Sequence, residues 1–171
     1  MLTQNRELMD SQENNTEKKG MGSYTKFFLM LGCSFIVMYI TMYLNTYAID
    51  HVYFSMTRFY MVCLGISTMA VIMWFFMRNM YTNKKKNIGI LVGSLLLFIG
   101  ALGLVRVQAP VVGDLLWLKG MIPHHSIAIL TSERADIKDP EVRKLADAII
   151  EAQRKEIEEM KIMIKRLENE K

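Results

Sequence analysis

The chain has 171 residues, of which 51% are hydrophobic and 22% are charged, and its formal net charge is +4 at pH 7. The length suits one domain, but the apolar residues are segregated in long runs, which indicates membrane segments followed by one small soluble part. The lysines and arginines flank the apolar runs, where membrane topology is the ordinary reason for them. The composition therefore argues against a nucleic-acid partner.

The first part of the chain is polar and the next part is strongly apolar. Residues 1–23 are rich in Asn, Gln, Glu and Lys without a periodic apolar face, and we expect a disordered cytoplasmic tail. Three apolar runs follow, at residues 27–47, 59–77 and 88–107, each near the roughly 20 residues that a helix needs to cross a bilayer. The sequence predicts a three-helix transmembrane region over residues 24–109, with the lipid bilayer as its partner.

The basic residues predict the orientation of these helices. Lysines precede the first run and a basic cluster lies between the second and third, whereas residues 50–58 carry one arginine or lysine, Arg58. The positive-inside rule then puts the N-terminus in the cytoplasm. Three crossings place residues 110–171 on the outer face, which predicts a periplasmic domain anchored in a bacterial inner membrane.

Residues 110–171 predict two helices. Residues 114–134 form the first, with Pro123 expected to kink it because proline lacks a backbone donor. Asp139 and Pro140 are a favourable helix start, and the second helix is expected to reach about Leu167. The predicted fold class is therefore all-α, with three transmembrane helices followed by an extracytoplasmic antiparallel helical hairpin.

Each of these two helices carries residues spaced three and four apart, as in a packing seam. On the second helix they are Val142, Leu145, Ile149, Gln153, Glu156, Met160, Met163 and Leu167. On the first they are Asp114, Trp117, Met121, His124 or His125, Ala128 and Thr131. Antiparallel pairing brings the middles of the helices together, so that the two histidines face Gln153, Glu156 and Met160.

This convergence predicts a metal site. Unpaired polar groups in a core cost about 1–3 kcal/mol each, so the groups either satisfy one another or hold an ion. Imidazole and thioether ligands favour copper, particularly Cu(I), over magnesium or calcium, and zinc is the alternative ion through histidine. Adjacent histidines point about 100° apart on a helix. A hydrogen-bonded structural core, with Glu156 as a histidine partner, therefore stays open.

A specific sequence motif resembles a known family. It comprises Asp114, Trp117, Met121-Ile122-Pro123-His124-His125 and Ala128, then Pro140-Glu141-Val142, Leu145-Ala146, Ile149-Ile150, Gln153, Glu156-Ile157 and Met160. These residues, over roughly residues 111 to 167, resemble the bacterial domain-of-unknown-function family 305.

The resemblance implies a ferritin-like helical arrangement in the periplasm or anchored to the membrane, and some members are similar to copper-binding proteins of the CopM type. Met121, His124, His125 and Met160 match the family pattern. Two residues depart from it: Thr131 stands where a further Met is usual, and Met163, where Trp is usual, is a further candidate ligand. The candidate metal ligands are then Met121, His124, His125, Glu156, Met160 and Met163.

The preferred function is that of a membrane-anchored extracytoplasmic protein that sequesters copper or silver. One hairpin buries little surface, so we expect a homodimer that forms a four-helix bundle. A metal-dependent oxidase is disfavoured because the chain contains no Glu-x-x-His pair, and we expect no enzymatic activity. The alternative is a structural or partner-docking module of an envelope complex that binds no metal.

Overall fold

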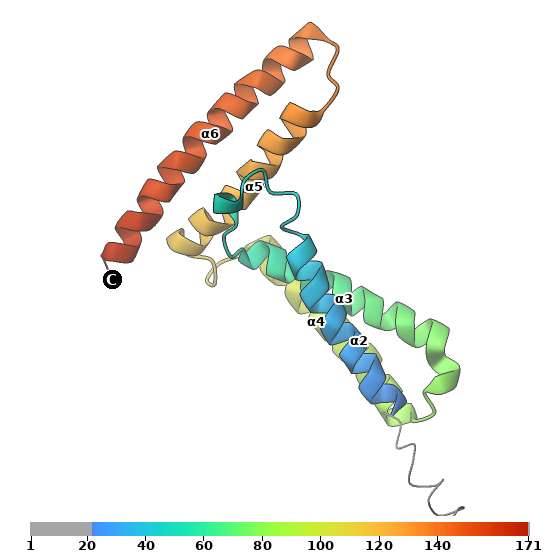
Figure 1. Cartoon of the computed structure of the whole chain (residues 1–171). Helices are drawn as coiled ribbons and strands as arrows, with labels where there is room; N and C mark the ends of the chain where they lie inside the picture. Colours follow the sequence, from blue (N-terminus) through green and yellow to red (C-terminus); the bar gives the residue numbers. More distant parts are fainter. Residues whose placement is uncertain (1–21, 171) are drawn as a thin grey trace, which may run out of the picture.

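A computed structural model describes residues 22–170, and the regular structure in this part of the chain is helical (Figure 1). The elements in order are α2 (Ser23–Thr41), η1 (Ile49–His51), α3 (Met56–Met77), η2 (Arg78–Met80), α4 (Lys84–Val107), α5 (Asp114–Arg134) and α6 (Pro140–Asn169). The predicted all-α class is confirmed. The predicted tail lies outside the described residues, apart from Gly22 and Ser23.

Helices α2, α3 and α4 lie side by side and form the three-helix region (Figure 1). Each is long and apolar enough to cross a membrane, with the second span running over Met56–Met80. The prediction that the first helix reaches Tyr47 is wrong, because α2 ends at Thr41. The hydroxyl groups of Thr41 and Thr46 donate to the carbonyls three residues earlier, and these side-chain bonds accompany a turn of the chain.

Helices α5 and α6 form a second unit, the helix pair. Its core contains Leu118, Ile122, Ile129, Ile157, Met160 and Ile164. The helices run antiparallel, since Lys119 near the start of α5 pairs with Glu168 near the end of α6 at 2.7 Å. At the other end, the Arg143 guanidinium donates to the Ser132 carbonyl at 3.1 Å. Pro123 lies inside α5, which continues beyond it to Arg134.

The buried stripe of α6 is rotated by one residue from the predicted seam. Leu145 is 61% exposed, Val142 is 51% exposed and Met163 is 43% exposed, so these three lie outside the core. The residues that face α5 are Ala146, Ile150, Ile157, Met160, Ile164 and Leu167. On α5 likewise, Asp114, Trp117 and Thr131 are exposed. The prediction failed because α6 carries two neighbouring apolar stripes with the same spacing, about 100° apart.

The start of α6 has a well-formed cap. Asp139 Oδ1 accepts hydrogen bonds from the backbone N–H groups of Glu141 at 2.9 Å and Val142 at 3.0 Å, and Pro140 occupies the first helical turn. These bonds satisfy donors that the helix itself leaves unpaired.

We expect Asp139→Ala to lower the free energy of unfolding by about 1 kcal/mol, the usual cost of losing such a cap. Thermal unfolding of the full chain in detergent, followed by circular dichroism, measures the effect. Asp136→Ala is the matched control, because Asp136 pairs with Lys138 on the exposed surface. Equal losses in the two variants would contradict the assignment.

The loop between α2 and α3, residues 42–55, packs on the helix pair (Figure 1). We call it the connecting loop. The fully buried Ser126 hydroxyl of α5 accepts from the Tyr47 N–H at 2.7 Å and lies 3.0 Å from Nδ1 of His51. Asp50 in η1 pairs with Lys161 of α6 at 2.6 Å. The loop therefore holds the helix pair against one end of the three-helix region.

This contact shifts the pKa values of the two ionisable groups of η1, Asp50 and His51. The Lys161 ammonium donates to Asp50 and lowers the pKa of that carboxyl. Burial lowers the pKa of His51, although Asp50 and Glu158 oppose the shift and Lys161 supports it. The neutral His51 ring suits its position, because Nδ1 can then accept a hydrogen bond from the Ser126 hydroxyl.

Candidate metal site

The structure separates the predicted metal ligands. Met160 is buried in the core of the helix pair, and the exposed Met163 lies on the outer side of α6. His125 turns toward α6, and Met121 and His124 line a cavity on the side of α5 that faces α3. Met121 also packs against the core that contains Met160. The rings of the two histidines lie 6.0 Å apart between centroids. The exposed Met163 and the Glu156-paired His125 thus lie apart from the cavity that Met121 and His124 line.

His125 is held between two acceptors. Its Nδ1 lies 2.9 Å from the Met121 carbonyl, and its Nε2 lies 2.8 Å from Oε2 of Glu156. The carbonyl can only accept, so Nδ1 is the donor of that hydrogen bond, while Nε2 contacts the Glu156 carboxylate. Gln153 also donates to Glu156, at 3.4 Å. The geometry shows the histidine partner role of Glu156 that the sequence left open.

The cavity between α5 and the start of α3 is the junction cavity. Its volume is about 330 Å³. It is lined by Ser55, Met56, Thr57, Arg58, Gln108, Val112, Leu116, Trp117, Gly120, Met121, His124 and Ile127. Two thioethers and one imidazole thus open onto one space, and the exposed His124 makes that space accessible from solvent.

Helix α5 approaches the start of α3 at two points near the junction cavity. A Cβ on Gly120 would lie 3.4 Å from Oγ of Ser55, which is an ordinary van der Waals distance. One turn later, the buried Arg58 guanidinium donates to the carbonyl of Pro123 at 3.3 Å. Ser55 also caps α3, since its hydroxyl accepts from the Arg58 N–H at 3.4 Å.

The charge around the junction cavity is positive. Arg58 lies 4.3 Å from the centre of the Tyr43 ring and donates to the Met42 carbonyl. Among the described residues that line the cavity there is no aspartate or glutamate. Since Coulomb repulsion scales with charge, a divalent cation here is repelled twice as strongly as a monovalent one. On electrostatic grounds alone, Arg58 disfavours a divalent cation in this cavity more than a monovalent one.

Met56 was not among the predicted ligands. It lies far from the histidine motif in the sequence, directly before Thr57 and Arg58 at the start of α3. The signal that could have found it is topological: with three crossings, residues 50–58 and residues 110–171 lie on the same side of the membrane. A methionine in that short segment was a candidate neighbour of the motif.

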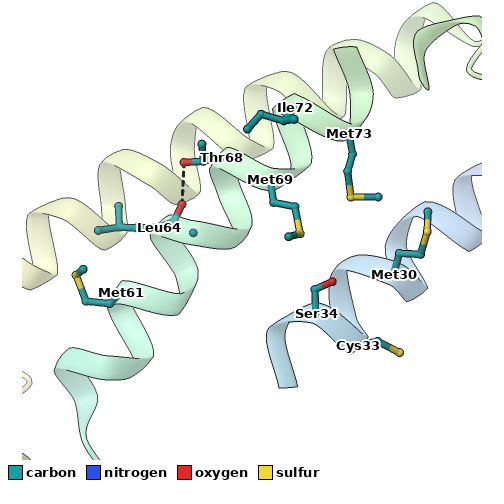
Figure 2. A pocket seen from close by; sticks show the side chains of 10 residues that line it. Met30, Cys33, Ser34, Met61, Leu64, Thr68, Met69, Ile72 and Met73 are labelled. Atoms are coloured by element: carbon teal, nitrogen blue, oxygen red, sulfur yellow. Dashed lines mark hydrogen bonds between the residues drawn. The ribbon is translucent and has the colours of Figure 1, made fainter. Parts of the chain in front are cut away.

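A larger cavity of about 890 Å³ lies between α2 and α3. Figure 2 shows Met69 and Met73 of α3 facing Met30 and Ser34 of α2. The Thr68 hydroxyl is satisfied by the Leu64 carbonyl at 3.0 Å, so the wall is nearly apolar. Methionine fills irregular apolar space readily, so apolar packing is the ordinary role of these residues.

Within residues 22–170, no three or more histidine, cysteine, aspartate and glutamate side chains are placed to hold a metal ion together. The junction cavity brings two methionines and His124 together.

Known proteins place the chain in a family. The family described as "Domain of unknown function (DUF305)" matches residues 106–169. An uncharacterized protein of Acanthamoeba polyphaga mimivirus is 35% identical over 135 residues, which cover 77% of this chain and 86% of that relative. The chain belongs to the DUF305 family. No solved structure gives a significant match.

The DUF305 match and the viral similarity differ in extent. The similarity to the viral protein is longer than the DUF305 segment, so it includes part of the three-helix region. The DUF305 segment contains Met121 and His124, whereas Met56 and the connecting loop lie outside it. The junction cavity is thus formed by the DUF305 segment together with residues that precede it.

Proposed function

We propose that this DUF305 chain binds Cu(I) or Ag(I) in the junction cavity, on the extracytoplasmic side of a membrane, and thereby sequesters the ion. The observation that carries the proposal is that Met121 and His124 line one solvent-accessible cavity. Thioether and imidazole are soft ligands that suit monovalent copper.

The electrostatic surroundings support a monovalent ion over zinc. Both ligand types are neutral, and Arg58 adds a positive charge to the wall without a carboxylate to balance it. The charge penalty is smallest for an ion of charge +1. Zinc and Cu(II) would be better placed beside Glu156, but there the nitrogen ligand is His125 alone, with Gln153 nearby.

The location outside the cytoplasm rests on the basic residues. Lys84, Lys85 and Lys86 begin α4 at the end of the three-helix region opposite the helix pair (Figure 1). The positive-inside rule assigns that end to the cytoplasm. The junction cavity then faces the outer compartment, where a sequestering protein meets ions before they reach the bilayer.

The two adjacent histidines offer a matched test. We expect His124→Gln to weaken Cu(I) binding by roughly tenfold or more, since even losing an outer partner of a ligand costs about 10–100-fold in metal affinity. His125→Gln should leave the affinity nearly unchanged, because its ring faces Glu156 instead of the cavity.

The measurement is a competition titration of the full chain in detergent against a chromophoric Cu(I) chelator, repeated with Ag(I). Saturable binding by the wild type and loss in His124→Gln alone support the proposal. Equal affinities of the two variants, or a larger loss in His125→Gln, would place the ion elsewhere. Failure of the wild type to compete refutes metal sequestration.

A structural module is the second candidate, and the connecting loop favours it. The bonds from Ser126 and Lys161 to the loop join the helix pair to the three-helix region without any ion. Thermal unfolding with and without Cu(I) separates the two functions. An ion that binds the folded state must raise the melting temperature, whereas a purely structural module keeps it unchanged.

A further inference from the structure

One candidate ligand that lines the junction cavity lies outside the DUF305 segment. Met56 is the first residue of α3, and its thioether side chain lines the cavity together with Met121 and His124. It lies between Ser55, which lines the same cavity as Gly120 of α5, and Arg58, which donates to the Pro123 carbonyl of α5. The bond from Arg58 therefore holds the start of α3, including Met56, close to the face of α5 that carries Met121 and His124.

The opposite wall of the cavity belongs to α5. Gly120 lines the same cavity as Ser55 and directly precedes Met121, and the Pro123 carbonyl that accepts from Arg58 directly precedes His124. Gly120 and Pro123 thus each stand next to one candidate ligand on α5. Met56 enters this arrangement from α3, so ligands from two separate parts of the chain meet in one cavity of about 330 Å³.

We propose that Met56 is a direct ligand of the ion, so that a three-coordinate site of two thioethers and one imidazole spans α3 and α5. The inference rests on the proposed function. Two sulfurs and one nitrogen, all neutral, form a soft donor set that favours Cu(I) and Ag(I) over oxygen-seeking cations. The isolated DUF305 segment lacks the third ligand and is expected to bind the ion more weakly than the full chain.

The test compares two single methionine losses in the full chain in detergent. Met56→Leu removes the thioether with little change in volume. Met163→Leu removes a thioether from the outer side of α6 and is the matched control. We expect Met56→Leu to lower Cu(I) affinity roughly tenfold or more, as for other changes in a metal's surroundings. X-ray absorption of the Cu(I)-loaded protein should show one sulfur neighbour fewer in Met56→Leu and no change in Met163→Leu.

Met56→His replaces the lost ligand with another soft donor. It is expected to recover affinity and to exchange a sulfur neighbour for nitrogen, which a merely structural role of Met56 would not produce. If the wild type binds Cu(I) while Met56→Leu keeps its affinity and sulfur count, the inference is overturned and the proposed function stands. If the wild type binds neither Cu(I) nor Ag(I), the proposed function itself fails.

Discussion

Ile157→Ala is expected to lower the free energy of unfolding of the helix pair by about 2–5 kcal/mol, the range for removing a large aliphatic side chain from a core. Ile157 is 1% exposed and belongs to the core that joins α5 to α6. The cavity left by the missing atoms adds to the lost burial of apolar surface. Denaturant unfolding of the full chain in detergent, followed by helical circular dichroism, measures the loss.

The control for this variant is on the same helix. Ile162 is 67% exposed, so Ile162→Ala should change the stability by no more than about 0.5 kcal/mol. The predicted seam of α6 placed Glu156 and Met163 in the core instead of Ile157 and Ile164. A greater loss at Ile162 than at Ile157 would show that α6 packs by a different face.

Ser126→Ala is expected to release the connecting loop from the helix pair. The change removes the acceptor of the Tyr47 N–H and the partner of His51, and an unsatisfied buried group costs about 1–3 kcal/mol. Hydrogen exchange followed by mass spectrometry should show faster exchange over residues 45–51, since protection follows the local opening free energy.

Ser132→Ala is a suitable comparison, because the Ser132 group that bonds to Arg143 is its backbone carbonyl, which the substitution leaves in place. Exchange over the connecting loop should remain at the wild-type rate in that variant. Unchanged protection of the loop in Ser126→Ala would mean that the buried hydroxyl does not hold it.

The order and length of the helices follow closely from the sequence. The three apolar runs predicted the three long helices, and residues 114–134 were predicted as the helix that the structure shows as α5. The end of α2 was missed because Tyr43 and Tyr47 look apolar enough to extend it. Tyr43 instead lies beside Arg58, and the Tyr47 N–H bonds to Ser126. These are tertiary contacts that a local pattern does not contain.

The sequence predicted the candidate site less well than it predicted the helices. The motif pointed to Met121, His124, His125 and Met160, and the 100° turn between adjacent helical residues indicated that His124 and His125 can face different neighbours. That divergence is what the structure shows, with His125 on Glu156 and His124 on the junction cavity. The rotation of α6 by one residue and the approach of Met56 depend on packing between helices. Spacing within one helix does not determine either of them.

The copper content of the full chain, purified from the membranes of copper-supplemented cells, tests the central claim most directly. The wild type should retain near-stoichiometric copper, and the variant with Met121→Leu and His124→Gln should lose it, because both substitutions remove soft ligands from one cavity. Wild-type protein that contains no bound copper after purification, or a double variant that retains as much copper as the wild type, would contradict the account.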